Sequence, residues 1–144
     1  MKKSFVLILM LAFFLTGCSS LDLDKVKEFG DPMTENMLQG MNNDDYNTFS
    51  KDFGSQMKES IDEAGYNDFK EQIIGIIGEY QSKELVKASY ESSNGQKFIV
   101  AIYQAKFSNE PEDVAVTVTF SDDPENRTIE GLFFNSPKLV ENSK

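Results

Sequence analysis

Histidine and tryptophan are absent from this sequence of 144 residues, and cysteine occurs once, at Cys18. Serine–histidine–aspartate triads, cysteine–histidine pairs and the usual zinc sites need side chains that the chain lacks. A single cysteine also excludes a disulfide within the chain. The composition therefore removes the commonest hydrolase sites, and we expect neither a metal site nor a cofactor.

Basic residues are scarce as well. Fourteen lysines and arginines face 24 acidic residues, which gives a formal net charge of −10. Such a chain repels phosphate backbones, so we exclude nucleic acid as a partner. The same charge repels an anionic membrane surface, and it predicts that the domain stands off the bilayer.

Long apolar runs are also rare, and the one at the start of the chain is informative. Lys2 and Lys3 precede the 11 apolar residues Phe5–Leu15, which are too few for the roughly 20 that span a bilayer. This layout is typical of an export signal. Leu15-Thr16-Gly17-Cys18 resembles the lipobox of bacterial-type lipoproteins. The resemblance implies that the Cys18 sulfur takes a diacylglyceryl group and that cleavage leaves Cys18 as the new N-terminus.

These features predict the organisation of the chain. We expect a signal peptide over residues 1–17, a lipidated tether over 18–30, one domain over 31–140 and a tail over 141–144. The mature protein is then anchored to the cell membrane on its extracytoplasmic face, and its first partner is the membrane itself, through the lipid on Cys18.

Helical spacing dominates the first half of the domain. Asp31-Pro32 is a typical helix start, and Met33, Met37 and Met41 follow on one face, where they favour core packing over a ligand site. A second helix capped by Asp44 or Asp45 is expected to bend at Gly54. A third is expected from Asn67. The apolar residues of these two helices are Tyr46, Phe49, Phe53, Met57, Ile61, Phe69, Ile73, Ile76 and Ile77.

Alternation with a period of two dominates the second half. Strands are predicted over 85–90, 97–107, 114–121 and 128–134, with a hairpin turn at Asn94-Gly95. The simplest sheet is an antiparallel meander. The sequence thus predicts an α+β fold with about three N-terminal helices packed on one face of a curved four-stranded antiparallel sheet.

Three segments carry a resemblance to a family. Asn42–Tyr46, Phe49–Phe53 with Met57, and Gly131–Pro137 resemble the small lipoprotein domains called domain of unknown function 3887. The resemblance covers roughly Val26 to Leu139. It implies the cystatin-like cone of nuclear transport factor two, in which helices and a bent sheet enclose a cavity. It implies no catalytic residues.

A pocket can be proposed on the long strand. Ile99, Ala101, Tyr103, Ala105 and Phe107 alternate inward, and the two alanines would leave space between larger side chains. The candidate pocket residues are Tyr90, Tyr103, Phe107 and Phe133. The alternative is a filled core.

Two functional classes follow. The first is a noncatalytic module that binds a small apolar ligand in the cone or an envelope protein on the sheet. The second is a cone-fold enzyme of the isomerase or dehydratase kind that uses a carboxylate and a tyrosine. We favour the first. A buried acid with a raised pKa facing a cavity would favour the enzyme, whereas a closed core with an exposed apolar sheet face would favour a protein partner.

The lipid anchor predicts a simple outcome. Replacing the sulfur nucleophile by Cys18→Ala should abolish membrane retention, because no acyl chain can be attached. Fractionation of cells that express either form measures this. A Cys18→Ala protein that stays in the membrane fraction would contradict the anchor.

Overall fold

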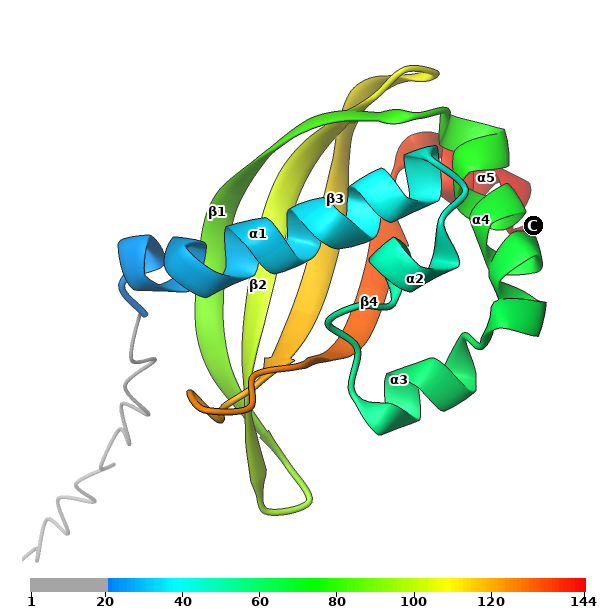
Figure 1. Ribbon diagram of the computed structural model, residues 1–144. Coiled ribbons are helices and arrows are strands. Elements are labelled where there is room, and N and C mark those ends of the chain that lie inside the picture. Colours follow the sequence, from blue (N-terminus) through cyan, green and yellow to red (C-terminus); the bar gives the residue numbers. More distant parts are fainter. Residues whose placement is uncertain (1–20) are drawn as a thin grey trace, which may run out of the picture.

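The computed structural model describes residues 21–144, and the predicted signal peptide and Cys18 lie outside them. The domain is α+β, as predicted (Figure 1). Five helices are present in the described residues instead of about three. The elements are α1 Leu23–Asn42, α2 Tyr46–Phe49, α3 Ser55–Ser60, α4 Glu63–Ile77, β1 Tyr80–Ser93, β2 Gln96–Phe107, β3 Glu110–Ser121, β4 Ile129–Asn135 and α5 Pro137–Asn142.

The four strands form one antiparallel sheet in the order β1-β2-β3-β4, which confirms the predicted meander. Asn94 and Gly95 make the β1–β2 turn with φ values of 51° and 77°, the left-handed region that these two residues tolerate. Ala101 on β2 lies opposite Ala88 on β1 and Val118 on β3. This register puts the predicted inward residues of β2 on the concave side of the sheet.

Helix α1 begins eight residues before its predicted start at Asp31. The Asp22 side chain caps it by accepting a hydrogen bond from the Asp24 N–H at 3.0 Å, and Val26 and Gly30 are already buried. Pro32 lies inside the helix with its ring exposed. The predicted tether over 18–30 is therefore wrong from Leu23 onward, because a proline that resembled a start signal is tolerated within a longer helix.

The predicted second helix is two helices. Its bend at Gly54 is a break, because this segment pairs with the sheet: the Gly54 N–H donates to the Ile129 carbonyl at 3.0 Å, and the Ile129 N–H donates to the Asp52 carbonyl at 2.7 Å. Those bonds occupy the start of the β4 edge. The next helix, α4, begins at Glu63 with Asp62 as its cap, four residues before the predicted Asn67.

Further boundaries differ from the prediction, and β3 begins at Glu110 instead of residue 114. Strand β1 begins at Tyr80 instead of residue 85, because register shifts between Tyr80 and Ser82 and between Leu85 and Lys87 interrupt its alternation. Ser136 caps an unpredicted helix, α5, which continues to Asn142 and so includes half of the predicted tail.

The core lies between α1 and the concave side of the sheet, which α1 crosses in Figure 1. The methionines of α1 are buried there, which confirms that their stripe is core. Opposite them lie the inward residues of the central strands. These are Ile99, Ala101, Tyr103, Ala105, Phe107, Val114, Val116, Val118 and Phe120, each at most 3% exposed. Within residues 21–144 no helix has the length and apolar character needed to cross a membrane.

Two glycine-to-alanine substitutions are expected to have opposite effects on the free energy of unfolding, because only Gly40 lies at the contact between α1 and α2. A methyl group at Gly40 would lie 2.3 Å from the backbone nitrogen of Phe49, so Gly40→Ala should force the helices apart and lower the free energy of unfolding by about 1–3 kcal/mol. Gly75 on α4 faces only the flexible end of Glu71, so Gly75→Ala should raise it by up to about 1 kcal/mol.

Urea unfolding of the soluble chain from Ser19 onward measures both effects. Since both positions are helical, the gain in helix propensity is the same, and the difference isolates the steric term. A Gly40→Ala protein as stable as the Gly75→Ala protein would contradict this packing.

Candidate functional site

The four predicted pocket residues lie in three different places. Tyr103 and Phe107 are in the core, 0% and 3% exposed. Tyr90 is 40% exposed near the β1–β2 turn, with the Lys97 ammonium 4.9 Å above its ring. Phe133 is 64% exposed on the side of the sheet away from α1. None of them lines the surface depressions described below, and the space beside Ala101 and Ala105 is filled.

A polar cluster lies where α1 meets β1. The Tyr80 hydroxyl donates to Glu35 Oε2 at 2.7 Å, and the Lys83 ammonium lies 3.1 Å from the same oxygen. Gln39 donates to Glu35 Oε1 at 3.1 Å. One turn later, the Asn42 side chain donates to the Tyr80 carbonyl at 2.7 Å and accepts from its N–H at 2.9 Å. These bonds join the middle and end of α1 to the start of the sheet.

The electrostatics of this cluster keep Glu35 ionised. Partial burial acts to raise the pKa of Glu35, but the hydrogen bonds from Tyr80, Gln39 and Lys83 outweigh it and hold the pKa below its usual value. Burial, reinforced by the neighbouring Glu35 charge, raises the pKa of Tyr80. The carboxylate is therefore an acceptor whose partners are already in place.

Tyr103 continues the cluster into the core. Its ring lies 5.6 Å from the Lys83 ammonium, and the Lys83 side chain is only 9% exposed. Its hydroxyl faces Gly30, where a methyl group would lie 2.7 Å away. Among the described residues, this hydroxyl, Thr34 Oγ1 and Asp31 Oδ1 are buried without a hydrogen-bond partner. Burial raises the pKa of Tyr103, so its phenol is neutral at physiological pH.

A carboxylate beside a tyrosine is the pair that the enzyme alternative requires. A general acid also needs a pKa raised towards neutrality and space for a substrate. Glu35 has a lowered pKa. For Glu110, a buried acid at the start of β3, burial acts to raise the pKa, but hydrogen bonds from Ser136 and from the N–H groups of Lys138 and Glu112 lower it. The hydrogen bonds of both carboxylates are therefore already made within the fold, and neither carboxylate has the raised pKa that a general acid needs.

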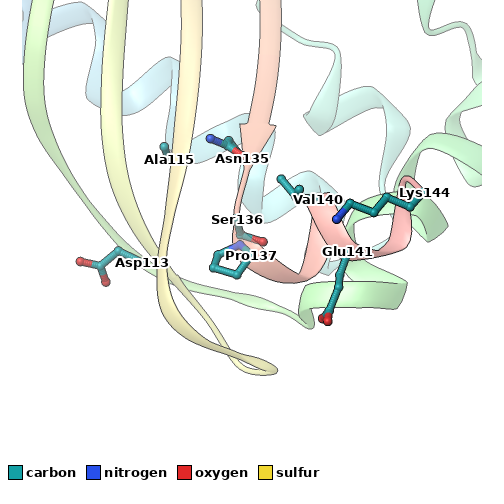
Figure 2. A pocket seen from close by; sticks show the side chains of 8 residues that line it. All are labelled: Asp113, Ala115, Asn135, Ser136, Pro137, Val140, Glu141 and Lys144. Carbon is teal, nitrogen blue, oxygen red and sulfur yellow. The ribbon is translucent and has the colours of Figure 1, made fainter.

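The hollows on the surface are open and shallow. Figure 2 shows one of about 630 Å³ between β3, the end of β4 and α5. It is lined by Asp113, Ala115, Asn135, Ser136, Pro137, Val140, Glu141 and Lys144. In the described part of the chain no group of three or more acidic side chains could hold a metal ion. This hollow offers no converging buried polar groups that would orient a small ligand.

The outer side of the sheet carries a row of mostly apolar side chains. Ile102 on β2 lies opposite Thr117 on β3, which lies opposite Phe133 on β4, and all three alternate with core residues. Phe98 and Val100 extend this row along β2 and are half-buried. We call Phe98, Val100, Ile102, Thr117 and Phe133 the outer face.

The helices leave most of the outer face open. In Figure 1, α1 and α2 lie on the concave side, and α4 lies beyond the β4 edge. Helix α5 borders one end of the outer side, where Val140 lines a hollow with Ala115 and Asn135. Ser55 and Gln56 of α3 reach its rim, where they border a depression of about 490 Å³ that also includes Phe98, Val100 and Glu130. The alternation of β2 predicts which of its side chains point outward. Only the register of β4 shows that Phe133 joins them.

Comparison with known proteins gives one result. A family model described as protein of unknown function (DUF3887) matches residues 34–132, about two thirds of the chain. No curated protein and no solved structure was found to match the chain.

The Glu35 cluster predicts a specific dependence of stability on pH. Because the pKa of Glu35 is lowered in the folded state, its contribution is present above the ordinary glutamate value of about 4.3 and is lost as pH falls through the folded value. Glu35→Gln should therefore cost stability at pH 7, by under about 1 kcal/mol because the group is half-exposed, and the cost should shrink progressively as pH falls below about 4.3.

Urea unfolding from pH 3 to pH 8 measures the difference. Glu84→Gln, at an exposed position of β1, is the matched control and should change the profile little. An equal loss at every pH for Glu35→Gln would show that the charge of Glu35 is unimportant.

Proposed function

The chain belongs to the DUF3887 family, whose members are described only as proteins of unknown function, and from its own surfaces we propose that it is a membrane-anchored interaction module. In this proposal the lipid on Cys18 holds the domain at the extracytoplasmic side of the cell membrane. The outer face binds an envelope protein, and no reaction is catalysed.

The first half of this proposal is supported by the start of the sequence. Lys2 and Lys3, the apolar run Phe5–Leu15 and the lipobox-like Leu15–Cys18 follow one another in the order that lipoprotein export requires. The apolar run is too short to span a bilayer, so retention at the membrane needs the lipid.

The second half is supported by where the apolar surface lies. A small apolar ligand would need space on the concave side, but the side chains of α1 and the inward residues of β2 and β3 fill that side. Phe133, in contrast, is 64% exposed in the row that contains Ile102. Large aromatic side chains on an apolar patch are typical of the centre of a protein interface. This exposed phenylalanine is the observation that favours a protein partner.

The runner-up is the cone-fold enzyme with a carboxylate and a tyrosine. The pair of Tyr80 and Glu35, 2.7 Å apart, is the observation in its favour. The lowered pKa of Glu35 and its additional bonds to Gln39 and Lys83 count against it, because an occupied and ionised carboxylate is a poor general acid.

Charge at the centre of the outer face should abolish binding. Phe133→Asp places a carboxylate where the partner's apolar surface would exclude water, so complexes formed in intact cells with an amine-reactive crosslinker should fall at least about tenfold. Gln72→Asp, on exposed α4, is the matched control and should leave the complexes unchanged. Circular dichroism of both variants checks the fold. Undiminished complexes with a folded Phe133→Asp protein would contradict the proposed binding surface.

A further inference from the structure

The folded domain begins very close to the proposed lipid attachment. Leu21 already packs against the core, and Asp22 caps α1. Three Cα-to-Cα steps separate Cys18 from Leu21, and a fully extended chain covers at most about 11 Å in three steps. The expected tether therefore has almost no length.

This distance places the domain against the membrane surface. The polar headgroup layer of one leaflet is about 5–8 Å thick, so Leu21 lies within a few ångströms of it. Helix α1 has 20 residues and is about 30 Å long, and β1 has 14 residues and is about 46 Å long. With the roughly 11 Å of residues 18–21 added, the outer face lies within roughly 60 Å of the headgroups in any orientation of the domain, and the expected stand-off from the bilayer cannot exceed this distance.

The lipid surface itself does not account for the exposed Phe133, because Phe133 lies away from the end of the domain that the lipid would hold at the membrane. The end of the domain that contains Leu21 carries Asp22, Asp24 and Glu28 together with Lys25 and Lys27, and the cation–π contact of Arg127 with Phe29, at 3.9 Å, joins the β3–β4 loop to it. That loop adds Asp122, Asp123 and Glu125. Of the large exposed apolar side chains of residues 21–144, Tyr90 lies at this end, in the row that pairs with Ile99 and Phe120, whereas Val86, Phe133 and Val140 lie elsewhere. The start of α1 and this loop together carry six acidic and three basic residues, so their net charge is negative and an anionic leaflet would repel them.

The rim of the outer face indicates the chemistry of a better occupant. Lys106 and Asp113 form an ion pair at one end of the rim, so their charges compensate each other. Glu84, Glu91 and Glu130 remain on the rim with one lysine, Lys87. An apolar centre with an acidic rim is complementary to an apolar surface edged by lysine or arginine.

We propose that the outer face binds the extracytoplasmic part of a protein held in the same membrane, and that the contacting surface of this protein is apolar with basic residues at its edge. This inference rests on the proposed function. Two proteins confined to the same thin layer meet at a high effective concentration, so a modest patch with one exposed phenylalanine is sufficient for association.

Site-specific photo-crosslinking of the full, lipidated chain in its own host tests the proposal. Phe133→p-benzoylphenylalanine places the probe at the centre of the outer face, and Gln72→p-benzoylphenylalanine on α4 is the control. Intact cells are irradiated, and the covalent adducts are identified by mass spectrometry. We expect an adduct from position 133 only, with a protein that has its own transmembrane segment or lipid anchor.

The charge of the partner is tested in the same cells. Glu84→Lys together with Glu91→Lys reverses the rim and should reduce the adduct from position 133 at least fivefold. The matched control, Asp68→Lys with Glu71→Lys on exposed α4, makes the same change in net charge and should leave the adduct unchanged. Equal adduct yields from the two double variants would contradict the proposal that the partner has basic residues at the edge of its contacting surface.

The remaining outcomes separate the two levels of the proposal. An adduct with a partner that lacks a membrane anchor, or with a second copy of this chain, would overturn the inference and leave the outer face as the binding surface. No adduct from position 133, with the protein still in the membrane fraction, would overturn both the inference and the binding half of the proposed function. Release of the protein from the membrane fraction would overturn the anchor.

Discussion

The fit of α1 against the concave side of the sheet is the constraint on which the rest of the structure depends. Two glycines of α1 make the fit possible. Gly30 leaves room for the Tyr103 hydroxyl, and Gly40 lets the α2 backbone approach at Phe49. The Gly40 carbonyl also accepts a hydrogen bond from the Tyr66 hydroxyl at 2.9 Å, which ties α4 to the same point. The side chains of the core can therefore pack closely on the concave side, where the inward residues of β2 and β3 are at most 3% exposed.

The close packing of the concave side is the reason why we assign the proposed function to the opposite side of the sheet. The residual polarity of the core, at Asp31, Thr34 and Tyr103, costs stability because buried polar atoms without partners lose their bonds to water. The Glu35 cluster beside it contributes bonds that hold α1 in place. The interior thus accounts for how the domain holds together, and the outer face, where Phe133 is exposed, is the surface to which we assign the proposed partner.

Much of this fold could be predicted because strands of period two and methionines at helical spacing are strong local signals. The element boundaries that were predicted wrongly rested on local sequence patterns that occur in more than one structural setting. Pro32 resembled a helix start but lies inside α1, and the irregularities of β1 concealed five residues of strand. The contacts of the Gly54 segment with Ile129 are tertiary, so no local pattern distinguishes that break from a bend.

The candidate site was harder to predict than the fold. Tyr103 and Phe107 share one face, as expected, but Phe133 and Phe134 are neighbours in a strand, and only one of them can point inward. The pairing of Val116 with Phe134 assigns that place to Phe134, and Phe133 points outward. The contact of Glu35 with Tyr80 joins residues 45 positions apart. No spacing rule in the sequence brings them together.

The most direct test of a filled interior is native mass spectrometry of the domain from Ser19 to Lys144, purified from its own host and compared with its denatured mass. If the concave side is closed, the native mass equals the mass of the bare chain. A reproducible noncovalent small-molecule adduct, lost on denaturation, would show a pocket and would contradict the assignment of function to the outer face.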